Sequence, residues 1–153
     1  MKRAYRLMLR EDPSSRDQYA RTPEELHKHL SEAWGPFDFD PCPVAPLFDG
    51  LSVSWRNNNY VNPPYNELRV WLDKAIREWN DGEKQVIFLM PIRIHTNYFL
   101  DTVMPLVESD RVHVYVLRGG VKFEGYKQRA PFGMIYLVFP SKSSKSLQPV
   151  HEL

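Results

Sequence analysis

Apolar residues recur at helical spacing in the first half of the chain. Residues 22–35, "TPEELHKHLSEAWG", predict a helix, with Thr22 at the N-cap position, Pro23 after it and Gly35 at the end. Its apolar face consists of Leu26, Leu30 and Ala33. A second helix is predicted over residues 68–79, where Trp71, Ala75 and Trp79 recur at the same spacing.

Apolar runs in the rest of the chain predict strands. The run "QVIFLMPI" at residues 85–92 is typical of a strand buried on both faces of a sheet. Strands are predicted at residues 37–40, 60–61, 85–92, 111–119 and 134–140. Residues 95–109 predict a further helix, broken near Pro105. The alternation indicates an α/β fold: a compact single domain with a mainly parallel sheet and helices on both faces.

Composition excludes several classes of function. The chain has 153 residues and a net charge of +1, so the molecule as a whole is not an electrostatic binder of nucleic acid. The single cysteine, Cys42, excludes an internal disulfide and a cysteine-rich metal site, and no histidines have metal-ligand spacing, so no metal is predicted. No apolar run is long enough for a signal peptide or a membrane span. We therefore expect a cytoplasmic protein.

The two ends of the chain differ in composition from the middle. We divide it into an arginine-rich arm at residues 1–16, one domain at residues 17–140 and a flexible Ser/Lys-rich tail at residues 141–153.

Two proline turns follow short predicted strands. One is "FDFD-PCP" and the other is "YV-NPPY". Ligands of α/β sheets bind at the carboxyl ends of the strands, so we expect two neighbouring pockets at one edge of the sheet.

The NPPY turn has the parts needed to hold an amino group. The amino group of a nucleobase is a poor nucleophile, and two acceptors aimed at its N–H bonds would free its lone pair. The side-chain oxygen of Asn62 and the carbonyl of Pro63 could supply those acceptors, and the ring of Tyr65 could stack on the base. The competing interpretation is a strand-ending turn with a half-buried Tyr65. The whole string directly after a strand favours the functional interpretation.

The string NPPY also resembles the catalytic signature of amino-directed methyltransferases that use S-adenosylmethionine. More narrowly, the chain resembles the phage-type DNA N6-adenine methyltransferase family (Dam-like) from about residue 17 to residue 140. The segments that carry the resemblance are "DQYARTPEEL", "FDFDPCP", "DGLSVSW", "YVNPPY", "VIFLMPIRIHTNYF" and "RGGVKFEGYKQRAPFGMIYLVF". It implies a Rossmann-like methyltransferase fold and methyl transfer to the N6 amino group of adenine in DNA, with base flipping.

The resemblance also implies roles for individual residues. The catalytic residues would be Asn62, Pro63, Pro64 and Tyr65. The cofactor would contact Tyr19, Thr22, Pro23, Asp40, Pro41, Cys42 and, as the weakest assignment, Asp49. Asp40 would accept from the ammonium group of S-adenosylmethionine. The competing interpretations are that Thr22 only caps a helix and that Cys42 is a small buried residue.

The sequence departs from the broader methyltransferase class after the first predicted strand. That class has a glycine-rich loop there, whereas this chain has "DPCPVAP".

Basic residues interleaved with aromatic ones indicate where DNA would bind. The candidates are Arg93, Arg118, Lys122, Lys127 and Arg129. The alternative for each is a solvated surface residue. The chain leaves little room for a separate recognition domain, so we expect a short target or a homodimer, in a host cytoplasm if the protein is viral.

Two rival functions stay open. In one, the acceptor is an RNA adenine, the N4 of cytosine or a protein glutamine. In the other, the fold is a nucleic-acid-binding module without catalysis.

Overall fold

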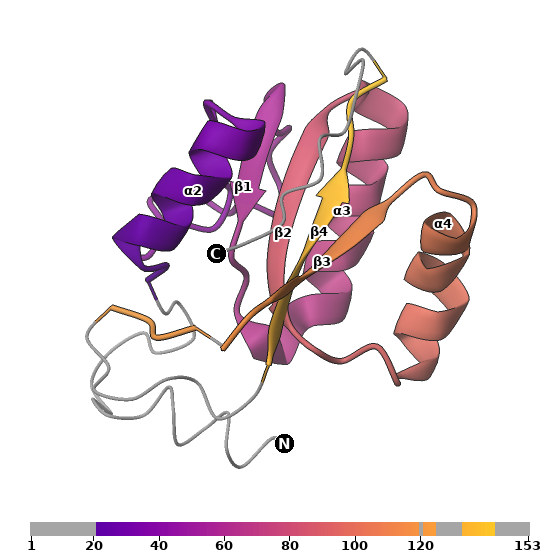
Figure 1. Ribbon diagram of the computed structural model, residues 1–153. Coiled ribbons are helices and arrows are strands. Elements are labelled where there is room, and N and C mark those ends of the chain that lie inside the picture. Colours follow the sequence, from indigo (N-terminus) through magenta and orange to yellow (C-terminus); the bar gives the residue numbers. More distant parts are fainter. Residues whose placement is uncertain (1–20, 120, 125–132, 143–153) are drawn as a thin grey trace.

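The computed structural model describes residues 21–119, 121–124 and 133–142 (Figure 1). The predicted arm, Tyr19, Lys127, Arg129 and nearly all of the predicted tail lie outside the described residues. The elements in chain order are α2 (Glu24–Trp34), β1 (Asn58–Val61), the 3-10 turn η1 (Tyr65–Glu67), α3 (Leu68–Gly82), β2 (Gln85–Pro91), the π-helical turn η2 (Phe99–Val103), α4 (Met104–Glu108), β3 (His113–Leu117) and β4 (Met134–Phe139).

The four strands form one mixed sheet in the order β1-β2-β4-β3. Strands β1 and β2 pair in parallel, whereas β4 is antiparallel to both of its neighbours. Strands β1, β2 and β3 therefore run in one direction and β4 runs against them, so the sheet is mixed and the expectation of a mainly parallel sheet is not confirmed. The departure lies in β4, which pairs with β3, the described strand before it along the chain. Antiparallel neighbours can be joined by a short hairpin, whereas parallel neighbours need a crossover.

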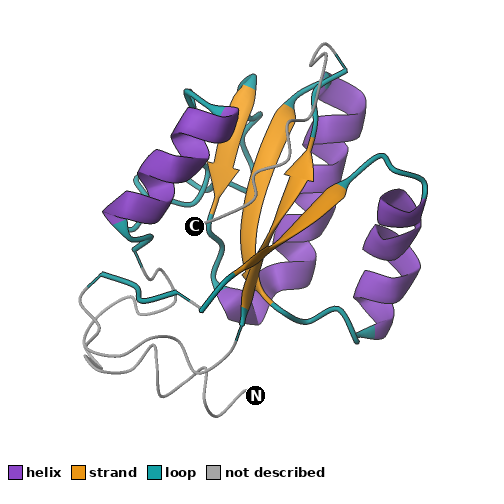
Figure 2. Ribbon diagram, viewed as in Figure 1, coloured by secondary structure: helices purple, strands orange, loops and turns teal. Residues whose placement is uncertain are grey.

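Helices cover both faces of the sheet, as predicted (Figure 2). The ring of Trp34 in α2 lies 5.7 Å from that of Tyr115 in β3, and Tyr115 stacks on Tyr136 of β4 at 4.9 Å. On β4, the ring of Phe139 packs edge-on against Trp79 of α3 at 5.6 Å. Tyr136 and Phe139 are three positions apart in one strand, so they point to opposite faces. Helix α2 therefore covers one face and α3 the other.

The two central strands form the core. Every residue of β4 is buried, and so is every residue of β2 after its first, Gln85. The predicted strand is confirmed at residues 85–91, and its burial on both faces from Val86 to Pro91. Such a strand needs apolar side chains at consecutive positions, because both sheet faces are covered.

Residues 41–57 form a long connection whose shape depends on one close approach. A Cβ atom on Gly50 would lie 1.8 Å from the carbonyl oxygen of Pro41, so only glycine fits there. The carbonyl of Gly50 accepts a hydrogen bond from Nε1 of Trp55 at 2.8 Å, and Trp55 stacks on Trp71 of α3 at 6.4 Å between ring centroids. These contacts fix the loop that follows Asp40.

We predict that Gly50→Ala lowers the free energy of unfolding by at least about 1–3 kcal/mol, because the methyl group displaces backbone. Gly82→Ala is the matched control. Its Cβ would meet only the flexible end of Lys84, so we expect no loss, or a gain of about 0.5–1 kcal/mol at the end of α3. Urea unfolding of both variants measures the difference, and equal stabilities would contradict the close approach.

Candidate functional site

The two proline turns meet at one edge of the sheet. Phe39 forms a parallel bridge with Asn59 of β1, and its carbonyl accepts from the backbone N–H of Tyr60 at 3.0 Å. This bridge replaces the short strand predicted at residues 37–40. It carries the chain past the end of β1, so that Asp40 and Asn62 line the same cavity.

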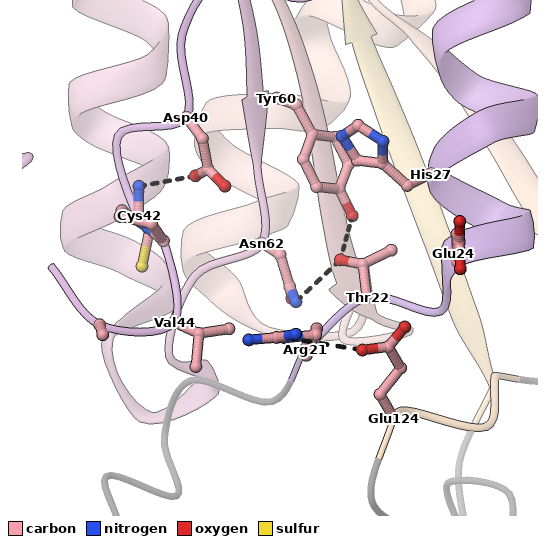
Figure 3. Close-up of a pocket in the computed structure, with 12 residues that line it drawn as sticks. Arg21, Thr22, Glu24, His27, Asp40, Cys42, Val44, Tyr60, Asn62 and Glu124 are labelled. Carbon is pink, nitrogen blue, oxygen red and sulfur yellow. Dashed lines mark hydrogen bonds and ion pairs between the residues drawn. The ribbon is translucent and has the colours of Figure 1, made fainter.

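This main cavity has a volume of about 580 Å³ (Figure 3). The described residues that line it are Arg21, Thr22, Glu24, His27, Asp40, Cys42, Pro43, Val44, Ala45, Tyr60, Asn62 and Glu124. A side cavity of about 400 Å³ also touches Cys42 and is otherwise lined by residues that include Pro41, Phe48, Asp49 and Trp71. The expected neighbouring pockets are thus present, although both proline turns contribute to the main one.

A chain of hydrogen bonds leads from the motif into the wall of the main cavity. The Tyr65 hydroxyl donates to Oδ1 of Asn62 at 3.3 Å, and Nδ2 of Asn62 donates to Oγ1 of Thr22 at 3.2 Å. The Thr22 hydroxyl also bonds to the Tyr60 hydroxyl at 2.6 Å (Figure 3). Four side chains from two distant segments are thereby linked.

Thr22 does not cap α2, contrary to the prediction. The helix begins at Glu24, its N-cap residue is Pro23, and no side chain makes a capping hydrogen bond. The first turn instead contains Glu24 and Glu25, whose negative charges stabilise the N-terminus of the helix through its dipole. The Thr22 hydroxyl is directed to Tyr60 and Asn62.

Tyr60 is a cavity residue that the sequence analysis missed. It is 2% exposed, and its ring packs edge-on against His27 at 5.1 Å. Burial raises the pKa of its phenol, so the hydroxyl stays protonated at neutral pH. Alternation along an extended segment offered a signal, because Tyr60 and Asn62 are two positions apart and therefore share a face.

Asp40 lies at the side of the main cavity with a raised pKa. The residue as a whole is exposed, but the surrounding protein desolvates the carboxyl group and raises its pKa from 3.8 to about 6. The backbone N–H of Cys42, 2.9 Å from Oδ1, partly offsets this effect. Burial also raises the pKa of the Cys42 thiol, which makes it a poor nucleophile.

An ion pair lies at the mouth of the main cavity. Nε of Arg21 is 3.5 Å from Oε2 of Glu124, and the backbone N–H of Glu124 donates to the Arg21 carbonyl at 3.1 Å. Among the described lining residues, three carry a carboxyl group and one, Arg21, carries a guanidinium group. The three are Glu24, Asp40 and Glu124. The described wall is therefore net negative when these carboxyl groups are ionised.

The NPPY residues themselves are buried. Asn62 is 9% exposed and Tyr65 only 2%, with its ring edge-on to Phe123 at 6.2 Å. Asn62 lines the main cavity, whereas Tyr65 is not among its described lining residues. Pro63 and Pro64 are buried as well, and the Pro64 carbonyl accepts from the N–H of Glu67.

The remaining candidates lie apart from the main cavity. Asp49 lines the side cavity, and its oxygens accept from the N–H of Leu51 and the hydroxyl of Ser52, which lowers its pKa. Nη1 of Arg93 donates to the carbonyl of Tyr65 at 3.1 Å, which anchors the end of the motif. The two described basic candidates in the loop, Arg118 and Lys122, are exposed.

The described residues contain no group of three or more His, Cys, Asp or Glu side chains that could hold a metal ion. No described helix is long and apolar enough to cross a membrane.

A family model described as DNA N-6-adenine-methyltransferase (Dam) matches residues 10–130, well over half of the chain. The chain belongs to this family. The resemblance found in the sequence is thereby confirmed. Membership of the family identifies the protein in general terms as a DNA adenine methyltransferase. No curated protein matches the chain.

We predict that Asp40→Asn stabilises the protein increasingly as pH rises. The carboxyl group has a higher pKa in the folded chain than its ordinary value of 3.8, so the folded state binds its proton more tightly. The wild type therefore loses stability as pH rises from about 4 past 6, and the neutral amide does not. Asparagine can still accept from the N–H of Cys42. Thermal unfolding between pH 4.5 and 7.5 measures the difference in stability between Asp40→Asn and the wild type. A difference independent of pH would contradict the desolvation of Asp40.

Proposed function

We propose that this protein transfers a methyl group from S-adenosylmethionine to the N6 amino group of a flipped adenine in DNA. The observation that carries the proposal is the shared main cavity of Asp40 and Asn62. A carboxyl group suited to a cationic ligand and an amide suited to an amino group lie in one wall. Within the family, we assign the methyltransferase domain to residues 17–140, the arm to residues 1–16 and the tail to residues 141–153.

The described cavity residues fit S-adenosylmethionine in size and charge. A volume of about 580 Å³ is in the usual range for small-molecule sites. The cofactor carries two positive groups, a sulfonium and an ammonium, and one negative carboxylate, so its net charge is positive. The net negative wall of the cavity complements that charge. We assign the ammonium group to Asp40 and the surrounding wall to Thr22 and Cys42. Pro23, next to Thr22, and Pro41, which lines the side cavity, are proposed to contact the cofactor as well. Tyr19 and Asp49 remain further candidates.

The amide of Asn62 and the carbonyl of Pro63 are proposed to hold the adenine amino group. Two acceptors on its N–H bonds favour a tetrahedral nitrogen with an available lone pair. When bound, S-adenosylmethionine supplies the methyl group: the nitrogen lone pair forms the new N–C bond, the C–S electron pair stays on sulfur, and the nitrogen releases one proton. Prolines suit this turn because they hold the chain rigid and bring no N–H groups beside the acceptors. Pro64 and Pro63 together keep Asn62 in place.

Stacking of Tyr65 on the target base is the most demanding part of the proposal. Its ring is buried against Phe123, so that stacking requires the segment at residues 121–124 to move. The hydrogen bond from its hydroxyl to Asn62 supports a role in orienting the amide as well.

The exposed Arg118 and Lys122 are proposed to bind phosphates of DNA. We propose the same for Lys127, Arg129 and Arg93, although Arg93 also holds the backbone of the motif. A homodimer and a cytoplasmic location are further proposals.

We predict that Asn62→Ala abolishes DNA methylation and changes the affinity for S-adenosylmethionine less than about threefold, because the amide acts on the acceptor and not on the cofactor. Modification-sensitive sequencing of DNA from expressing cells, together with a labelled-methyl assay on DNA, RNA and protein, measures the product. Isothermal titration measures the affinity.

Asn97→Ala is the matched control, because Asn97 is an exposed asparagine that is not among the described lining residues of the main cavity. Full activity in Asn62→Ala would refute the mechanism. Label on RNA or protein alone would move the function to another acceptor, and the absence of any binding heat in the wild type would favour a module without catalysis.

We predict that the affinity for S-adenosylmethionine falls as pH drops below about 6, since protonation of Asp40 removes the acceptor of the ammonium group. Asp40→Asn should bind weakly at every pH between 5 and 7.5, with no such dependence. Isothermal titration of both proteins across that range tests this, with Asp81→Asn, in the last turn of α3, as the control. A parallel fall in wild type and Asp40→Asn would assign the titration to another group.

A further inference from the structure

We propose that Thr22 is a positioning residue for the reaction: its hydroxyl anchors Nδ2 of Asn62 and thereby restrains the amide that holds the acceptor amino group. This inference rests on the proposed function of Asn62. It assigns Thr22 a task other than helix capping, in addition to its proposed place in the wall of the cofactor site.

The geometry that carries the proposal is the linked chain of hydroxyl and amide groups. Nδ2 of Asn62 is 3.2 Å from Oγ1 of Thr22, and Oδ1 of Asn62 is 3.3 Å from the Tyr65 hydroxyl. The amide is therefore held at both of its ends.

An asparagine amide needs such an anchor because its two ends have nearly the same shape. Rotation about its last torsion angle is broad, with no strong staggered preference. Turned by half a revolution, the amide would present N–H donors to an amino group that must itself donate. A catalytic group misplaced by about 1 Å can cost on the order of 100-fold in rate. In the observed orientation the hydroxyl of Thr22 accepts from Nδ2, and this bond restrains rotation of the amide.

Thr22 is itself held in place from two sides. The following residue is Pro23, and a residue before proline is confined to extended backbone conformations. Its hydroxyl is 2.6 Å from that of Tyr60, whose ring is 2% exposed and packs against His27 and Phe37. Hydroxyl groups rotate freely, but the oxygen of Thr22 has a fixed position here. Tyr60 is accordingly a second, weaker positioning residue.

The first test compares Thr22→Val with Thr22→Ser. Valine has the same shape without the hydroxyl, and serine keeps the hydroxyl. We expect Thr22→Val to lower kcat for DNA methylation by about 10- to 100-fold, with the Kd for S-adenosylmethionine changed less than about threefold. Thr22→Ser should stay within about threefold of the wild type. A normal kcat in Thr22→Val, or a loss confined to cofactor affinity, would overturn the proposal.

A second readout does not depend on activity. The side-chain NH₂ signals of Asn62 in ¹H–¹⁵N spectra are assigned by their absence in Asn62→Asp. We expect Thr22→Val to shift these signals and to speed their exchange with water, and Thr22→Ser to leave both unchanged. Unchanged signals in Thr22→Val overturn the anchoring itself. An inactive wild type with shifted signals in Thr22→Val would instead refute the proposed function and leave the anchoring intact.

A double-mutant cycle with Tyr60→Phe tests the order of the chain. If Tyr60 acts through Thr22, Tyr60→Phe lowers kcat less than Thr22→Val does, and the double variant is no worse than Thr22→Val alone. Additive losses would mean that Tyr60 acts independently, which contradicts this part of the proposal. Thermal unfolding of each variant shows that it is folded before its rate is compared.

Discussion

The candidate site depends on the buried side-chain amide of Asn59, whose hydrogen bonds join β1 to the turn before it and to the start of strand β2. The side chain of Asn59 is fully buried, and its oxygen accepts from the N–H of Arg56 at 2.9 Å. Its Nδ2 donates to the carbonyls of Arg56, at 2.9 Å, and Gln85, at 3.0 Å. A buried amide without partners would cost about 1–3 kcal/mol per group, so this segment has one favourable arrangement. The apolar core then tolerates a polar residue at its edge.

That arrangement determines the chemistry at the end of β1. The register that pairs Phe39 with Asn59 brings Asp40 and Asn62 to the same cavity. Desolvation of the Asp40 carboxyl group costs stability at neutral pH, as its raised pKa indicates. A protein that holds a carboxylate in this way gains by binding a cation beside it. The hydroxyls around Asn62 stay uncharged, so the amide remains in a neutral setting next to the acidic wall.

The sequence was most informative where one physical effect dominates. A strand buried on both faces must be apolar throughout, so β2 and β4 were predicted from single runs of residues. The direction of β4 was not, because direction depends on pairing partners and not on composition. Thr22 has the side chain of a helix cap, but a competing contact with Tyr60 and Asn62 directs its hydroxyl elsewhere. The separation of Asp49 from the main cavity follows from the fold of a loop, which no local pattern encodes.

The magnitudes of these interactions decide what holds Thr22 in place. Helix α2 buries Leu26, Leu30 and Trp34 against the sheet. Each large apolar side chain contributes about 1.5–3 kcal/mol when fully buried, whereas a hydrogen bond between neutral groups contributes a net 0.5–1.5 kcal/mol, roughly. The packing of α2 therefore fixes the position of Thr22, and the bond to Asn62 forms as a consequence. Because the hydroxyl adds little to stability, its loss can disturb the amide of Asn62 while the fold persists.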